Sequence, residues 1–200
     1  MSQETVQIEV PRFVVHLRPH VDLTDDQLLD LCRRNPELRF ERTADGELII
    51  MPPVGGESGR RNSGLNALLW NWARRDGTGI AFDSSTGFVL PNGAMRSPDA
   101  AWVRRPRWDA LGPAERERFL PLCPDFVTEV RSASDRLAEV QEKMREYLDN
   151  GAELGWLIDP YSRSVFVYRP GTEVEELRDP ERVSGDPTLP GFLLDLGEVF

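Results

Sequence analysis

The stretch PDFVTEVRSASDRLAEVQEKMREYLDNG, residues 124–151, contains the pattern that decides the fold. Its apolar opening, which precedes a serine-rich turn, predicts an inner strand over Val127–Arg131. The segment Ser134–Asn150 has the apolar spacing of one helix face, so we expect a helix packed beside that strand. The apolar face consists of Leu137, Val140, Met144 and Leu148. A strand followed by a helix that packs on it indicates an α/β protein.

Two ionisable residues stand out inside this stretch. Glu129 falls where the apolar pattern calls for another hydrophobic residue, and Lys143 is the only lysine among 24 lysine and arginine residues. Arginine is effectively always charged, whereas a lysine can be tuned to release a proton, so Lys143 is a candidate for chemistry. The alternative is an exposed helix pair, in which Lys143 forms a salt bridge with Glu139 or Glu146.

Length and composition fit one soluble domain. The 200 residues suffice for a single core, and we expect one domain over residues 1–200 with residues 1–22 as an N-terminal extension. No apolar run approaches the roughly 20 residues of a membrane span, and residues 1–10 lack the features of a signal peptide. Cys32 and Cys123 are far apart and match no metal spacing, so we expect buried thiols and a cytoplasmic location.

The charge is distributed unevenly along the chain. A net charge of −10 argues against a protein that coats nucleic acid non-specifically. Residues 51–131, however, hold 11 basic and 9 acidic residues, including those of Arg104–Trp108, which we interpret as a solvated basic loop. The alternative is that this loop contacts phosphate and stacks a base.

The rest of the chain alternates helices with short strands. Helices are predicted from Thr24 to Arg34 and from Ser58 to Arg75, and a hairpin is predicted around Ala44-Asp45-Gly46. Because several strands are joined by short turns, the sequence favours α/β with a mixed sheet over a doubly wound parallel sheet. The other expected strands are Phe13–Leu17, Gly79–Phe82, Thr86–Leu90, Ala100–Val103, Leu154–Asp159, Ser164–Tyr168 and Val174–Leu177, and the apolar segment Leu189–Leu196 should dock on the core.

Two carboxylates stand at the ends of apolar strands. Asp99 precedes the strand Ala100–Val103, and Glu129 follows the apolar run at Val127. If these strands are neighbours, the pair suits Mg²⁺, which takes one or two protein carboxylates and keeps positions for water and phosphate oxygens. A lysine beside such a site can orient or deprotonate water, so these residues are the parts for metal-assisted phosphodiester hydrolysis.

The order of these residues resembles the PD-(D/E)XK nuclease superfamily. Pro98-Asp99 is followed by Glu129-Val130-Arg131 and then by a helix with Lys143. More narrowly, the chain is similar to the Uma-type restriction endonucleases of bacteria, and the resemblance runs from Thr24 to the end. It rests on SPDAAWV (97–103), PDFVTEVRSASD (124–135), EKMREYLDNGAELGWLIDP (142–160) and LPGFLLDLGEVF (189–200).

The resemblance implies a fold and a set of site residues. It implies a restriction-endonuclease-like fold, with a curved mixed sheet flanked by helices. It places metal ligands at Asp99, Glu129 and the carbonyl of Val130, and an acidic site residue at Glu57. The usual lysine position holds Arg131, a poor proton acceptor, and the lysine is moved to the next helix at Lys143.

The sequence leaves three functions open. The first is a Mg²⁺-dependent endonuclease acting on DNA, with Mn²⁺ able to substitute, in which Lys143 activates or orients water and Arg131 holds phosphate. The second is a nucleic-acid-binding or regulatory module that keeps the fold without turnover. The third is an assembly protein that uses Trp70, Trp102 and Trp108. Because enzymes that cut two strands often act as symmetric pairs, we expect a homodimer or higher homo-oligomer.

Overall fold

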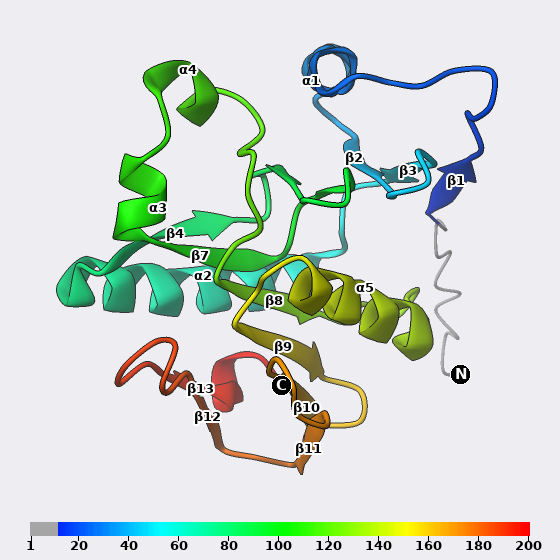
Figure 1. Cartoon of the computed structure of the whole chain (residues 1–200). Helices are drawn as coiled ribbons and strands as arrows, with labels where there is room; N and C mark the ends of the chain where they lie inside the picture. Colours follow the sequence, from blue (N-terminus) through cyan, green and yellow to red (C-terminus); the bar gives the residue numbers. More distant parts are fainter. Residues whose placement is uncertain (1–11) are drawn as a thin grey trace, which may run out of the picture.

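A computed structural model describes residues 12–200 (Figure 1). The helices are α1 (Asp25–Arg34), α2 (Gly56–Asp76), α3 (Arg105–Asp109), α4 (Pro113–Arg116), α5 (Leu137–Asp149) and a final 3-10 turn over Leu196–Glu198. The strands are β1 (Phe13–Val15), β2 (Arg39–Arg42), β3 (Leu48–Met51), β4 (Gly79–Asp83), β5 (Phe88–Val89), β6 (Met95–Arg96), β7 (Ala100–Arg104), β8 (Phe126–Val130), β9 (Leu154–Asp159), β10 (Ser164–Tyr168), β11 (Glu175–Arg178), β12 (Arg182–Ser184) and β13 (Leu193–Asp195).

The central sheet is mixed, as the sequence predicts. It has six strands in the order β11-β10-β9-β8-β7-β4, and β8 is an inner strand. The pair β8 and β9 is parallel, because α5 provides the crossover between them, and the other neighbours are antiparallel. A second sheet has the order β1-β3-β2-β6-β5, and β12 pairs with β13.

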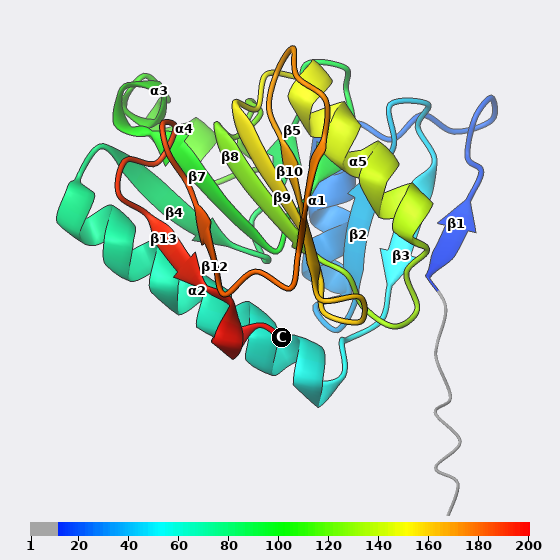
Figure 2. The same ribbon diagram turned by 90° about the horizontal axis from the view of Figure 1, so that it is seen from below.

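The two long helices cover opposite faces of the central sheet (Figure 2). Alternate side chains of β8 divide between them: Phe126 joins the core under α2, and Val127 joins the core under α5. Gly155 on β9 permits close packing of α5, because a Cβ there would lie 2.5 Å from the Met144 methyl carbon. Each large apolar side chain buried in this way stabilises the fold by about 1.5–3 kcal/mol.

The second sheet brings β2 beside α5. The predicted hairpin forms between β2 and β3, and its turn uses Gly46 at a φ of +82°. Along β2, Phe40 packs in the small core that also contains Leu28 of α1. Because side chains alternate along a strand, Glu41 points to the other side, toward α5. The hairpin therefore delivers a carboxylate to the helix that carries Lys143.

Most of the predicted elements form, although the strands expected at Phe13–Leu17 and Thr86–Leu90 are shorter, and β6, β12 and β13 were not predicted. Helix α5 begins at Leu137 instead of Ser134, because the Asp135 side chain caps the preceding turn at the Ser132 backbone N–H. The prediction of a loop over Arg104–Trp108 is wrong, because helix α3 forms there. Pro106 lies in its first turn, where a helix accommodates proline.

Both ends of the described chain are attached to the fold. The C-terminal segment docks on the core as predicted, and the structure places it on the α2 side through Leu189, Phe192, Leu194 and Leu196. At the other end, β1 lies within the expected N-terminal extension and pairs with β3. The first 11 residues of that extension lie outside the described residues. Among residues 12–200, no helix combines the length and apolar character that crossing a bilayer requires.

Candidate active site

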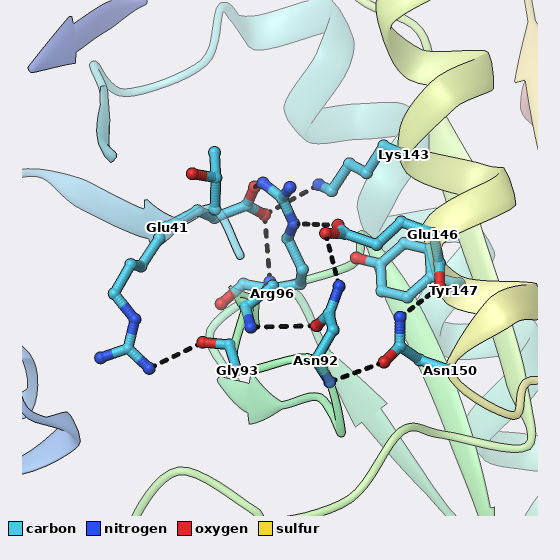
Figure 3. Close-up of polar contacts among 12 residues, drawn as sticks. Glu41, Asn92, Gly93, Arg96, Lys143, Glu146, Tyr147 and Asn150 are labelled. Carbon is cyan, nitrogen blue, oxygen red and sulfur yellow. Dashed lines mark hydrogen bonds and ion pairs between the residues drawn. The ribbon is translucent and has the colours of Figure 1, made fainter. Parts of the chain in front are cut away.

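The Lys143 ammonium contacts two buried carboxylates, and Figure 3 shows it directed toward one of them, Glu41. Its Nζ is 2.8 Å from Glu41 Oε1 and 2.8 Å from Glu129 Oε1. The alternative of an exposed helix pair is wrong, because Glu139 contacts Arg12 and Arg136, and Glu146 contacts Arg96. The only lysine of the chain thus points inward, between two carboxylates that come from different sheets.

Glu129 lies on β8, and a residue of α5 orients its side chain through a hydrogen bond. Its Oε1 accepts a hydrogen bond of 3.0 Å from the Tyr147 hydroxyl, one helical turn beyond Lys143. Tyr147 is fully buried in the core under α5, so it both packs and orients the carboxylate. Nothing in the local sequence pattern indicates this hydrogen bond.

Asp99 enters the site from the start of β7. Its Oδ2 accepts from the Val130 backbone N–H at 2.8 Å, and its Oδ1 accepts from Asn62 Nδ2 at 2.7 Å. Asn66, one turn further along α2, donates to the Asp99 carbonyl at 2.8 Å. The hydrogen bond to Val130 links Asp99 directly to the residue after Glu129, so the two predicted carboxylates share one end of the sheet.

Glu41 is a site residue that the sequence does not reveal. Its side chain is only 3% exposed, although three of the four residues of β2 are charged, a pattern that favours a solvated strand. Its Oε2 is 3.1 Å from Arg96 Nη1, and its Oε1 also accepts from the Ser97 backbone N–H at 3.0 Å.

Burial and neighbouring charges shift the pKa values in this cluster. Burial raises the pKa of Glu129 to about 8, the charges of Asp99 and Glu41 add to the rise, and Lys143 opposes it. Burial also raises the pKa of Asp99, against its hydrogen bond from Val130. For Lys143, burial lowers the pKa, but Glu129 and Glu41 outweigh burial and raise it. Lys143 is therefore held as an ammonium.

Glu41 responds in the opposite direction to Glu129. Burial raises its pKa, but Lys143 and Arg96 more than offset burial, and the net shift is downward. Glu41 is thus the ionised partner of Lys143, while Glu129 is the carboxylate that retains a proton near neutral pH. An incoming cation would displace that proton.

The donor set fits a divalent cation. Among residues 12–200, no group of three or more His, Cys, Asp and Glu side chains is arranged around a metal position. Asp99 and Glu129 lie close enough for the charge of Asp99 to raise the pKa of Glu129. Two carboxylates are what Mg²⁺ typically takes from a protein. Beside them, the buried Asn62 Oδ1 has no hydrogen-bond partner and can accept from a metal-bound water.

The charge balance of the cluster points the same way. With all groups ionised, its carboxylates exceed its directly contacting cations by two charges, and Arg39 adds a cation that acts at longer range. This excess of negative charge in a buried place is costly unless a cation compensates it. The groups are Glu41, Asp99, Glu129, Glu146, Lys143 and Arg96.

Glu57 and Arg131 are directed elsewhere. Glu57 stands in the exposed first turn of α2, where its Oε1 is 2.7 Å from Arg60 and 3.4 Å from Arg61. Arg131 follows β8, but its Nη1 is 2.9 Å from Asp159 Oδ2 and its Nε donates to the Asp135 carbonyl. The structure thus brings together Asp99, Glu129, Val130 and Lys143, while Glu57 and Arg131 form ion pairs with other residues.

Comparison with known proteins agrees with this architecture. Residues 25–197 match the family Uma2, described as "Putative restriction endonuclease", which confirms the resemblance drawn from the motifs. A solved structure, described as a putative nuclease belonging to DUF820 from Anabaena variabilis, is 23% identical with a TM-score of 0.73. The similarity covers 89% of this chain and 97% of that one, and it shows the fold. No curated protein matches the chain.

Proposed function

We propose that this chain, which belongs to the Uma2 family, is a metal-dependent endonuclease that hydrolyses phosphodiester bonds of DNA. Asp99 and Glu129 would hold Mg²⁺, or Mn²⁺ in its place, with the Val130 carbonyl as a further ligand. The observation that carries the proposal is the Lys143 ammonium, which is buried against Glu129 at 2.8 Å in a cluster with excess negative charge. The family description and the nuclease named for the similar structure support it.

Each residue has a defined task in this proposal. When bound, the metal would polarise a phosphate oxygen and lower the pKa of a bound water. Asp99 keeps one orientation because Val130 and Asn62 each donate to one of its oxygens. Lys143 is held protonated, so we assign it the orientation of water and the stabilisation of phosphate charge, in place of proton abstraction.

The remaining residues stand further from the reacting phosphate. Arg131 remains a proposed phosphate contact at the rim, where its guanidinium is 23% exposed and already fixed by Asp159. Glu57 receives no role, because its carboxylate pairs with Arg60 and Arg61 in an exposed turn. Tyr147 orients Glu129 through the hydrogen bond from its hydroxyl.

The direct test is cleavage of supercoiled DNA in Mg²⁺ or Mn²⁺, with Asp99→Asn as the inactive control. We expect nicked and linear products from the wild type and about 10³-fold less from the variant, because one of two metal-binding charges is lost. DNA binding without cleavage in either metal would contradict the proposal and favour a binding module. Size-exclusion chromatography of the same sample tests the expected homodimer.

A further inference from the structure

Glu41 is anchored independently of the lysine that it contacts. Its Oε2 pairs with Arg96 at 3.1 Å, and the Ser97 backbone N–H donates to its Oε1 at 3.0 Å. Both anchors belong to or follow β6, the neighbour of β2 in the second sheet. A carboxylate held from two sides by its own sheet keeps its direction when a long, flexible partner moves.

The anchors continue to the turn before β6. Arg96 Nε is 2.6 Å from Glu146 Oε2, and Asn92 Nδ2 donates to the other Glu146 oxygen at 3.1 Å. Asn92 also receives support from α5, because its backbone N–H donates to Asn150 Oδ1 at 2.8 Å. Figure 3 shows this series of contacts joining Glu41, Arg96 and the Asn92 turn to the middle of α5 and to its C-terminal end. The position of Glu41 relative to the helix is thus fixed by several bonds.

We propose that Glu41 is a positioning residue, which holds the Lys143 ammonium in place beside Glu129. The inference rests on the proposed function, because Lys143 is the group through which Glu41 acts. A lysine side chain has four rotatable carbons and loses considerable freedom when it is fixed. With two carboxylates at 2.8 Å, the ammonium is confined between them. With only one, it moves onto Glu129 and neutralises a carboxylate that the metal requires.

The proposal gives the second sheet a role in the site. Without the hairpin that carries Glu41, the central sheet and α5 still supply Asp99, Glu129 and Lys143. The hairpin adds Glu41, a second carboxylate that the Lys143 ammonium contacts besides Glu129. A buried carboxylate is costly unless it is paired, and Glu41 is paired with both Lys143 and Arg96.

The unique lysine provides a test that does not depend on nuclease activity. In protein labelled with ¹⁵N-lysine, only one side-chain ammonium can give a signal, that of Lys143. We expect a single Nζ resonance in the wild type, protected from fast exchange with water by its two ion pairs. Glu41→Gln should shift this resonance and speed its exchange by about tenfold, because one charged acceptor becomes neutral.

Glu139→Gln is the matched control. Glu139 lies one helical turn before Lys143 but pairs with Arg12 and Arg136, so its loss should leave the Nζ signal unchanged. An unchanged resonance in Glu41→Gln overturns the proposal. If Glu41→Gln does not fold, Glu41→Asp keeps the buried charge but shortens the reach by one methylene, and the same shift is expected.

A double-mutant cycle on cleavage asks whether Glu41 acts through Lys143. We expect Glu41→Gln to lower kcat about tenfold in the wild-type background, with KM for DNA within about twofold, and to have no further effect in Lys143→Met. Independent, additive losses would overturn the proposal. A wild type that does not cleave DNA would instead count against the proposed function, and the lysine resonance would still decide the role of Glu41.

Discussion

Two buried carboxylates at the two ends of β8 have opposite surroundings. Asp125, just before the strand, is 2% exposed and meets only donors: the Arg104 backbone N–H at 2.8 Å and the Arg107 guanidinium at 3.0 Å. Glu129, near the other end, is 8% exposed and shares its surroundings with two further carboxylates, Asp99 and Glu41. Asp125 and Glu129 are almost equally buried, so the difference between them lies in the charges of their neighbours.

This comparison contrasts a carboxylate whose charge is compensated within the fold with one that we propose binds a metal. Asp125 closes a loop and leaves no uncompensated charge, because Arg104 also approaches its Oδ1 at 3.4 Å. At Glu129, the contacting cation is Lys143, and the same ammonium also pairs with Glu41, which Arg96 contacts as well. Buried carboxylates that lack a full set of counter-charges are costly, and a divalent cation, as proposed, would compensate them.

Among the variants that sharpen this comparison, the largest effect is expected for Lys143→Arg. Arginine keeps the charge and pairs well with carboxylates, so the variant should fold. Its planar fork does not reproduce an ammonium placed 2.8 Å from two different acceptors, and we expect the cleavage rate to fall about 10²-fold. Arg145→Lys, a reciprocal change at an exposed position of the same helix, should stay within about twofold. Equal rates for Lys143→Arg and the wild type would make Lys143 a structural residue.

The next effect is the pH dependence of metal binding. The pKa of Glu129 is raised from 4.5 to about 8, so the metal-free fold keeps a proton that the unfolded chain has released. That contribution to stability is present at low pH and is lost as pH rises through this window. A metal must displace the same proton, and Mn²⁺ affinity should increase up to about tenfold per pH unit below about pH 8.

Calorimetric titrations with Mn²⁺ at several pH values measure this dependence. In parallel, urea unfolding of metal-free protein should show the wild type losing stability relative to Glu129→Gln as pH rises from 4.5 toward about 8. Affinity that does not change with pH over this window would mean that Glu129 binds the ion without losing a proton, or does not bind it.

A smaller effect is expected at the other end of β8. In Asp125→Asn, the amide oxygen can still accept from the Arg104 backbone, but the charge facing Arg104 and Arg107 is lost. Because both guanidinium groups are about 40% exposed, solvent screens the pairs. We expect the free energy of unfolding to fall by about 1–2 kcal/mol in urea, with Mn²⁺ binding unchanged. If Asp125→Asn lost Mn²⁺ binding, the proposed difference between Asp125 and Glu129 would be wrong.

The smallest effect is expected for Glu57→Gln. The carboxylate is 57% exposed and its ion pairs with Arg60 and Arg61 are within one helical turn, so they contribute little. We expect the cleavage rate to change by less than about twofold and the free energy of unfolding by less than about 0.5 kcal/mol. A loss comparable to that of Lys143→Arg would return Glu57 to the site, as the family resemblance implied.

The parts of the site that could be predicted are those marked by local pattern. Glu129 interrupts an apolar run, Asp99 starts one, and Lys143 is unique in a chain rich in arginine. The same periodicity fixes the strand and helix that carry them, and therefore the mixed sheet.

The missing parts depend on contacts between distant segments. Glu41 meets Lys143 across 102 residues, and a charged residue in a charged strand gives no sign of burial. Asn62 and Asn66 lie four apart on α2, where asparagine is a weak helix former, which is a faint signal of a tertiary role. The family resemblance assigned Arg131 and Glu57 to the site. In the folded chain Arg131 pairs with Asp159 and Glu57 pairs with Arg60 instead.

The central claim is that Glu129, and not Asp125, belongs to a metal site. The most direct measurement is calorimetric titration of Mn²⁺ into the wild type, Glu129→Gln and Asp125→Asn at about pH 8, where about half of Glu129 is ionised. We predict one site in the wild type and in Asp125→Asn, and an affinity at least about tenfold lower in Glu129→Gln. Equal affinities in the wild type and Glu129→Gln would contradict the account.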